Sequence, residues 1–429
     1  MLWVLVAFTV FLLMGMPVAF AIGISGCLFF LQHPELPSTI PIQLTISETQ
    51  NFALLAVPLF ILAGNFLNSS GIAHNLLQLA TVLTGRLQGG LAQTSIALST
   101  LMSGVTGSCI ADAAMNSRIL GPQMLKRGFS KGYAAGVISY GSLMAPIIPP
   151  GIGFILYGTV GQVSIGRLFA AGIIPGLLLW AALALTISIT ARRRGYAPER
   201  DRRATLREIA AASWGGIWAI LFPVILLAGL RFGIFTPSEI GAFAVVYAVL
   251  VGMFAYRALT RASIREALEG SLVDVGAVMF LLALSAIFGY GIVFERIPEV
   301  VSTWMVGLTD SPNLVMVIIV LLILFLGTFM EGSVLIIMLT PIFLPLATKY
   351  GIDPVHFGLV FIIAATIGNF TPPVGGAMFV VCQILKCRIG EYTRESMPFL
   401  VAVSAVTVLL VFVPEVVLLV PDWIFGKDR

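Results

Sequence analysis

Charged side chains are scarce in this chain of 429 residues. Asp, Glu, Lys and Arg make up only 10% of the sequence, against roughly one-quarter in soluble domains, while hydrophobic residues make up 59%. This excludes a soluble domain, and no nucleic-acid partner is expected. The apolar runs repeatedly reach the roughly 20 residues that a helix needs to cross a bilayer, without the alternation of a membrane β-barrel. The composition indicates an all-α polytopic membrane protein surrounded by lipid.

Cysteine and histidine are also sparse. The four cysteines lie in or near apolar stretches without metal-ligand spacing, which predicts free thiols among packed helices and no bound cofactor. The sequence also lacks a Gly-x-x-x-x-Gly-Lys-Ser/Thr phosphate loop, so the chain is not expected to hydrolyse ATP itself.

Two segments rich in proline and glycine interrupt the apolar runs and resemble one another. They are 145–151 (APIIPPG) and 368–375 (GNFTPPVG). An offset of about 223 residues aligns them together with several flanking residues. The aligned pairs are Gly104 and Gly327, Pro122 and Pro345, Lys126 and Lys349, Gly128 and Gly351, Pro149 and Pro372, Pro150 and Pro373, Gly153 and Gly376, and Pro175 and Pro398. Because Gly and Pro fix breaks in regular backbone, the repeat preserves a pattern of helix interruptions.

The first half of the chain predicts crossing helices, a lateral arm and a hairpin. Residues 2–31 contain Gly15-Met16-Pro17 but no basic leader or clear cleavage site, so we interpret them as a retained helix. Two apolar pieces on either side of 103–108 are each too short to span, which predicts a re-entrant hairpin. The predicted elements are a crossing at 52–67, an interfacial arm at 72–83, the hairpin at 90–131, a crossing at 133–163 broken at 146–151, and a crossing at 168–191.

The second half predicts the same set of elements again. They are crossings at 214–230, 239–256 and 271–293, an arm at 297–308, a hairpin at 314–349 with its tip at 327–333, a broken crossing at 355–385, and a final helix at 399–419. Arginine-rich loops at 192–207 and 257–265 indicate the cytoplasmic side. About five crossings separate the hairpins. Since this number is odd, the halves are predicted to be inverted, with the N-terminus inside and the C-terminus outside. The parity reverses if the arm at 297–308 spans the membrane.

Inverted repeats whose broken helices meet near the bilayer midplane are typical of secondary transporters. A channel fits less well, because paired hairpins suit a gated site better than a continuous pore. A single helix break is often only a proline kink. Four breaks that form two matched pairs in the two repeats are not explained in that way. The predicted division is a scaffold with an arm (1–89), a first transport repeat (90–191), a basic loop with scaffold helices and a second arm (192–312), and a second transport repeat (313–429).

A series of short motifs follows in order along nearly the whole chain. They are Ser103-Gly104 through ADAA at 111–114, Gly141 with IIPP at 147–150, YG at 157–158, LFAAGIIPG at 168–176, and TPPVG at 371–375. Together they resemble the large membrane subunit of tripartite ATP-independent periplasmic (TRAP) transporters. Gly151, Cys109 and Asn116-Ser117 depart from the common pattern, and these departures concern the identity of the substrate more than membership of the family.

The resemblance implies sodium-coupled import of small organic anions across the bacterial inner membrane. Such a subunit works with a small membrane subunit and with a periplasmic binding protein that delivers the substrate. It also implies an elevator-type mechanism, in which the hairpins and broken helices move as one body against a scaffold. Dicarboxylates, keto acids, sugar acids and sialic acids all suit the N–H groups at half-helix starts, and proton coupling remains an alternative.

Sodium prefers oxygen ligands, so the hydroxyls and free carbonyls at the breaks are the candidate ligands. The first proposed sodium site comprises Ser103, Gly104, Ser108, Gly141 and Ser142, and the second comprises Gly327, Thr328, Thr366, Gly368, Asn369 and Thr371. The alternative for each is that Ser and Thr bond a preceding carbonyl and Gly allows close packing. The residues proposed for substrate binding or coupling are Asp112, Glu331, Ser333, Pro149, Pro150, Pro372 and Pro373.

Acidic residues inside the apolar segments are functional candidates because a charge is costly there. Asp112 and Glu331 lie nearest the hairpin tips and are expected to bind sodium, to carry a proton or to cap a half-helix. Asp274 and Glu415 lie closer to the predicted helix ends and are expected to be structural.

An intramembrane protease is the alternative from another class. Gly23-Ile24-Ser25-Gly26 matches the short pattern around the nucleophile of rhomboid-type serine proteases, in which a serine pairs with a histidine. The pattern is weak in a chain with 43 glycines, because close helix packing selects small residues. The histidines are His33, His74 and His356, each near a predicted helix end. The chain is therefore predicted not to be an enzyme.

Overall fold

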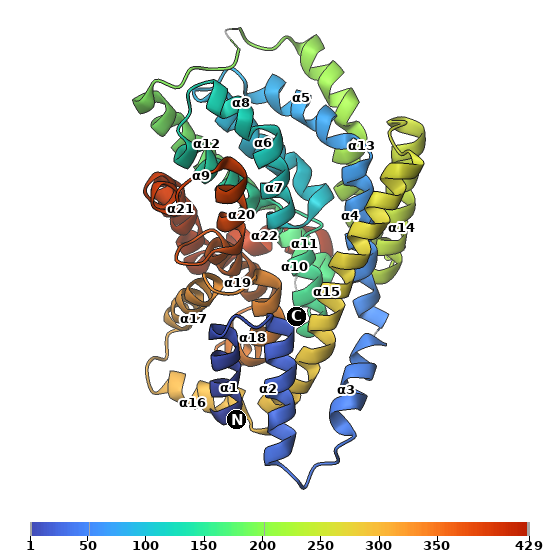
Figure 1. Cartoon of the computed structure of the whole chain (residues 1–429), viewed down its shortest axis with the longest axis vertical. Helices are drawn as coiled ribbons and strands as arrows, with labels where there is room; N and C mark the ends of the chain where they lie inside the picture. The colour runs from blue at the N-terminus through green and yellow to red at the C-terminus, as the bar shows by residue number, and fades with distance from the viewer. Residues whose placement is uncertain (1, 51, 201, 427–429) are drawn as a thin grey trace.

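The computed structural model describes residues 2–50, 52–200 and 202–426. Within these ranges the regular structure is entirely helical (Figure 1). Six helices in the described part are long and apolar enough to cross a membrane. A seventh span results if α4 (Ala56–Ser69) and α5 (Ile72–Thr84), which are bent by 70° at a short break, count as one. The prediction of an all-α polytopic protein is confirmed.

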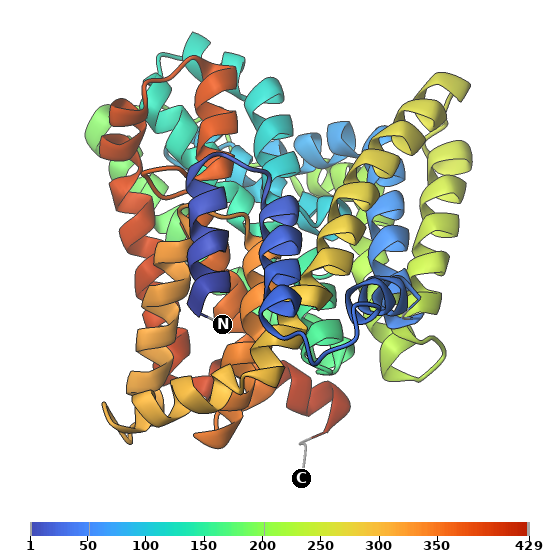
Figure 2. The same ribbon diagram turned by 60° about the horizontal axis from the view of Figure 1, so that its bottom comes forward.

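The N-terminal segment is a hairpin of two short helices and not the single helix that the sequence predicted. α1 (Leu2–Leu13) and α2 (Val18–Gln32) flank Gly15, whose φ of +80° suits glycine, and Pro17, which is the N-cap of α2. The two helices stand side by side in Figure 2. Because they reverse direction, α1 begins on the side of the molecule where α2 ends, away from the basic loops. The expected cytoplasmic N-terminus is therefore wrong.

α3 (Ile40–Thr49) and a 3₁₀ turn (Phe52–Leu55) lead into α4, which runs back toward the basic side of the molecule (Figure 2). α5 is a separate helix, as predicted for the first arm. It begins after Gly71, which has a φ of +78°. α5 packs between α6 (Gly90–Thr106) and α13 (Leu206–Arg231), so it joins the first hairpin to the long helices.

The first repeat contains the predicted hairpin and the predicted broken crossing. α6 and α7 (Cys109–Ile119) turn back on one another at Gly107, which has a φ of +58°. The crossing is interrupted between α9 and α10 by irregular backbone that includes Pro149 and Pro150. The remaining elements are α8 (Gly121–Lys126), α9 (Lys131–Gly141), a 3₁₀ turn (Ser142–Met144), α10 (Ile152–Val160), α11 (Ile165–Ala171) and α12 (Ile173–Arg194).

Long helices connect the two repeats. α13 is followed by α14 (Pro237–Leu250), a π-helical turn (Val251–Ala255), α15 (Arg261–Phe294) and α16 (Ile297–Val306). α15 packs against α2, α3 and α4, while α14 packs against α4. These elements form the wall on which the repeats rest, and α16 is the separate second arm that the sequence predicted.

The second repeat reproduces the first. Its hairpin is α17 (Pro312–Gly327) and α18 (Gly332–Lys349), and its broken crossing is α19 (Pro354–Asn369) and α20 (Gly376–Leu385). The predicted final helix at 399–419 is wrong in its bounds. α21 (Ile389–Phe412) ends before Pro414, and a separate α22 (Pro414–Phe425) follows. α22 is held by the buried Arg167 of α11, whose Nη2 lies 2.8 Å from Asp422 Oδ1.

The two hairpins open to opposite sides of the molecule, as the inverted repeat predicts (Figure 2). The mouth of the first lies at the basic loop, where Arg127 Nη2 is 2.7 Å from Glu199 Oε1. The mouth of the second lies at α16, where Lys349 Nζ donates to Ser302 Oγ over 2.8 Å. The packing is reciprocal, since α7 packs against α20 and α18 against α10. Each hairpin thus contacts the broken crossing of the other repeat.

A histidine links the end of α2 to the end of α15. His33 Nδ1 lies 2.7 Å from Glu35 Oε1, and its Nε2 lies 3.3 Å from Glu295 Oε1. The hydrogen bond with Glu35, and more weakly that with Glu295, raises the pKa of His33. A raised pKa in the folded state stabilises the fold below the unfolded pKa of about 6.5, and this contribution is lost as pH rises through the folded value.

We therefore expect His33→Gln to lower the thermal midpoint of the purified protein at about pH 6 and to have less effect as pH rises above the folded pKa of His33. The measurement is a series of melting curves from acid to alkaline pH. His74→Gln is the matched control, because the His74 ring lies 3.0 Å from the uncharged Gln78. A loss in His33→Gln that does not change with pH would contradict the expectation.

Candidate functional site

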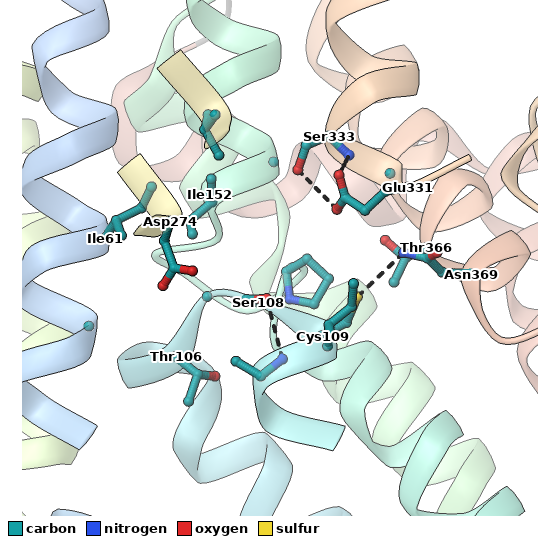
Figure 3. A pocket seen from close by; sticks show the side chains of 18 of the residues that line it. Ile61, Thr106, Ser108, Cys109, Ile152, Asp274, Glu331, Ser333, Thr366 and Asn369 are labelled. Carbon is teal, nitrogen blue, oxygen red and sulfur yellow. Dashed lines mark hydrogen bonds between the residues drawn. The ribbon is translucent and has the colours of Figure 1, made fainter. Parts of the chain in front are cut away.

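A cavity of about 520 Å³ lies where the two hairpin tips meet the long helices (Figure 3). One wall comes from both repeats, with the tip of the first hairpin, the starts of α10 and α18, and the end of α19. The other wall comes from α4 and α15. Five of the residues proposed from the sequence line this cavity, namely Ser108, Glu331, Ser333, Thr366 and Asn369. The inverted repeats therefore bring residues more than 200 positions apart to one site.

The starts of α7 and α18 are capped by equivalent residues. Ser108 is the N-cap of α7 and its Oγ accepts from Ala111 N over 3.5 Å. Glu331 is the N-cap of α18, where one carboxylate oxygen accepts from Ser333 N over 3.0 Å and the other from Ser333 Oγ over 3.1 Å. The two caps are related by the repeat offset. The capping role considered for Glu331 is thus present, and it holds the carboxylate in the cavity wall.

A contact across the cavity joins the repeats directly. Asn369 Nδ2, at the end of α19, lies 3.8 Å from Cys109 Sγ, at the start of α7 (Figure 3). Cys109 was not among the residues proposed from the sequence, which marked it only as a departure from the family pattern. Its position next to the predicted hairpin tip could have indicated that it lies at the site.

Five of the six proposed hydroxyl ligands, all except Ser108, donate to a preceding carbonyl oxygen. These bonds run from Ser103 to Thr100 (2.6 Å), Ser142 to Ile138 (2.9 Å), Thr328 to Phe325 (2.8 Å), Thr366 to Ile362 (2.7 Å), and Thr371 to Ile367 (2.8 Å). This is the structural alternative for Ser and Thr in membrane helices. A hydroxyl that donates its proton keeps its oxygen lone pairs, so the arrangement also remains open to a cation.

Three of the proposed glycines lie in tight contacts. A Cβ atom on Gly368 would be 2.6 Å from the backbone of Gly327, so α17 and α19 cross where neither has a side chain. A Cβ atom on Gly104 would lie 2.7 Å from Pro223 Cγ and 3.5 Å from Pro149 O. Close packing is therefore a sufficient reason for glycine at these positions.

The Pro-Pro segments lie beside the hairpin tips of their own repeats. A Cβ atom on Gly107 would be 3.1 Å from Pro150 O, which places the first segment against the tip of the first hairpin. In the second repeat, Gly375 N donates to Thr328 O over 2.8 Å. Both Pro-Pro bonds, 149–150 and 372–373, are cis. None of the four prolines lines the cavity, and all four lie in the backbone breaks beside it.

Asp112 lies behind the first hairpin tip in a buried polar network. Its Oδ2 accepts from Ser99 Oγ over 2.6 Å and from Asn116 Nδ2 over 3.1 Å, and Asn116 Nδ2 also lies 2.7 Å from Ser99 Oγ. Gly141, from the proposed first sodium site, adjoins this network, because a Cβ atom there would be 3.6 Å from Ser99 Oγ. Asp112 is therefore next to the proposed site but outside the cavity wall.

The α4 and α15 wall carries polar residues that were not proposed from the sequence. Asn65 Nδ2 of α4 lies 3.0 Å from Ser271 Oγ and 3.2 Å from Asp274 Oδ2, both of α15. Asn65, Asn68 and Asp274 line the cavity. The expectation that Asp274 is structural rested on a helix beginning near Ser271. α15 begins at Arg261, so Asp274 lies well inside it, and its side chain faces the cavity (Figure 3).

Comparison with known proteins decides the family. A model of the family "Tripartite ATP-independent periplasmic transporter, DctM component" matches residues 5–416. The 2,3-diketo-L-gulonate TRAP transporter large permease protein YiaN of Escherichia coli is 35% identical over 410 residues, covering 96% of each chain. The sialic acid TRAP transporter large permease protein SiaM of Vibrio cholerae is 33% identical, covering 97% of each. The chain belongs to the TRAP large permease family.

Two solved structures share the fold of this permease. The YdaH transporter of Alcanivorax borkumensis has a TM-score of 0.59, with 16% identity and 89% of each chain covered. MtrF of Neisseria gonorrhoeae has a TM-score of 0.55, with 14% identity, covering 90% of this chain and 84% of its own. At these identities the likeness concerns the fold alone.

The protease pattern in the permease has a packing explanation. A Cβ atom on Gly26 would be 3.0 Å from Phe288 N of α15, so small residues let α2 approach α15. Ser25 Oγ donates to Ala21 O over 2.6 Å. The histidines bond elsewhere, His33 to Glu35 and Glu295, His74 to Gln78, and His356 to Leu410 O. The relatives are transporter permeases and not enzymes, which confirms the prediction made from the sequence.

Proposed function

We propose that this permease imports small organic anions by sodium-coupled secondary transport with an elevator-type motion. The observation that carries the proposal is the cavity with one wall from both repeats and the other from α4 and α15. A site between a paired-hairpin body and separate long helices suits the sliding of one against the other. The N–H groups at the starts of α7 and α10 supply the anion-binding chemistry.

The proposal places the permease in the bacterial inner membrane. Its partners are a small membrane subunit and a periplasmic binding protein. The isethionate TRAP transporter permease protein DctMQ of Oleidesulfovibrio alaskensis is 33% identical, and the present chain covers 64% of it. The family combines a large with a small membrane subunit, and the additional length of DctMQ is consistent with both on one chain. We therefore infer that this permease works together with a small membrane subunit.

Sodium should raise the thermal midpoint of the purified permease above its value in potassium at equal ionic strength. An ion that binds only the folded state stabilises it by mass action, by about 2.7 kcal/mol at 100 times its dissociation constant. We expect Ser103→Ala or Thr371→Ala to reduce this sodium-specific rise, because each removes a proposed oxygen ligand. The measurement is a set of melting curves in sodium chloride and in potassium chloride.

Thr393→Ala is the matched control. Thr393 Oγ1 donates to Ile389 O over 2.9 Å, the same type of bond as at Thr371, but on an exposed turn of α21 outside the site. The control should keep the full sodium effect. Equal midpoints in both salts for the unmodified permease would contradict sodium coupling and favour protons, in which case Asp112 and Glu331 become the carriers to test.

A further inference from the structure

The α4 and α15 wall of the cavity presents an acidic side chain held in place by an amide. Asp274 Oδ2 accepts from Asn65 Nδ2 over 3.2 Å, and the same amide nitrogen is 3.0 Å from Ser271 Oγ. These bonds join α4 to α15 and fix the orientation of Asn65. The Asp274 side chain is exposed, lines the cavity and points into it (Figure 3). It therefore offers free acceptor capacity to a bound molecule.

The opposite wall offers acceptors as well. Glu331 is fixed by Ser333, whose N and Oγ lie 3.0 and 3.1 Å from its carboxylate oxygens. Each carboxylate oxygen has further lone-pair capacity beyond one such bond. A ligand in the cavity thus lies between two carboxyl groups, one from each wall.

Basic side chains do not balance these acids. Among the described residues that line the cavity, none is Lys, Arg or His. A ligand carboxylate must then be held by backbone N–H groups at the half-helix starts and by the coupling cations. One carboxylate can be placed at a helix start, but a second would approach Asp274, and like charges at short range disfavour one another.

We propose that the substrate is a monocarboxylate with several hydroxyl groups, of the sugar-acid type, and that Asp274 is a specificity-determining residue that accepts hydrogen bonds from those hydroxyls. The inference rests on the proposed function, since it assigns the substrate class of the same site. The cavity volume of about 520 Å³ suits a molecule of this size. Dicarboxylates without hydroxyls are selected against, because they bring a second charge and no donor.

The test measures binding of D-gluconate and of succinate to the purified permease by calorimetry in sodium chloride. The unmodified permease should bind D-gluconate and should bind succinate about tenfold more weakly or not at all. Asp274→Asn should weaken D-gluconate binding about tenfold and strengthen succinate binding, because it removes a charged acceptor but keeps an oxygen for Asn65. The matched control is Glu269→Gln, an exposed acid of the same helix, bonded to Arg265 at 2.6 Å and absent from the cavity wall.

Succinate binding as tight as that of D-gluconate would overturn the inference, as would a preference that Asp274→Asn leaves unchanged. Absence of D-gluconate binding would overturn it too. The proposed sodium coupling is contradicted by a different result. It predicts a melting temperature that depends on sodium without any organic acid, so equal melting temperatures in the two salts would reject it. Sodium stabilisation together with succinate preference would therefore reject the substrate class and keep the coupling.

Discussion

Gly368→Ala should prevent the second hairpin from packing on its broken crossing. The new Cβ atom would lie 2.6 Å from Gly327 Cα and 2.9 Å from Leu324 O. These contacts are with backbone, so no side chain can move aside, and α17 and α19 must separate. Overpacking of this kind costs about 3 kcal/mol or more. We expect a large fall in the melting temperature of the purified permease and a loss of monodisperse protein in size-exclusion chromatography.

The same substitution separates the two roles considered for Gly368. Alanine keeps the backbone carbonyl. If Gly368 served only as a cation ligand through that carbonyl, Gly368→Ala would not lower the melting temperature in the absence of sodium. A backbone clash does not depend on ions, and the loss should therefore be equal in sodium and potassium chloride. Gly390→Ala on α21 is the control, because nothing lies within 4 Å of its new Cβ atom. A variant that is stable in potassium and fails only to respond to sodium would show that packing is not the reason for glycine at 368.

The sequence predicted the breaks well, because their causes are local. Gly107 and Gly375 adopt positive φ, and proline cannot continue a helix, so the positions of these residues mark the hairpin tips and the broken crossings. The basic loops at 192–207 and 257–265 predicted which hairpin opens to which side. The same local signal is present at Gly15 and Pro17, where α1 ends and α2 begins. The prediction of one helix over 2–31 followed the length of the apolar run instead, and it was wrong.

The cavity wall was predicted only in part, because it depends on contacts between distant segments. Asn65 and Asp274 are 209 positions apart and meet because α4 packs against α15. No local sequence pattern in either helix predicts this contact. Asp274 also lies where the polar start of α15 meets its apolar remainder. A prediction based on the length of the apolar run alone therefore places Asp274 at the end of a helix.

The tip of the first hairpin is in close contact with the long helices, which bears on how an elevator-type motion would proceed. A Cβ atom on Gly64 of α4 would lie 2.9 Å from Val105 O, and one on Gly104 would lie 2.7 Å from Pro223 Cγ of α13. At Gly64 one backbone lies directly on another, whereas the Pro223 ring packs into the space beside Gly104. An elevator-type motion would have to change both contacts.

Asp112→Ala should destabilise the permease by about 3 kcal/mol or more, since it leaves Ser99 Oγ and Asn116 Nδ2 without the buried acceptor they share. Asp112→Asn is the matched control, because its amide oxygen can still accept from at least one of the two donors. The measurement is chemical or thermal unfolding in potassium chloride, where no sodium effect contributes. Equal stability of the Ala and Asn variants would contradict a structural role for the network.

The second repeat indicates why this network is more than a packing device. At the repeat offset, Asp112 corresponds to Leu335 and Asn116 to Leu339, and both leucines are buried. The fold can therefore fill these positions with apolar side chains. A double variant with Asp112→Leu and Asn116→Leu should regain much of the stability that Asp112→Ala loses, because apolar replacement of a whole buried polar group avoids unpaired donors. If Asp112 serves coupling, that stable variant should still lack the sodium-specific rise in melting temperature.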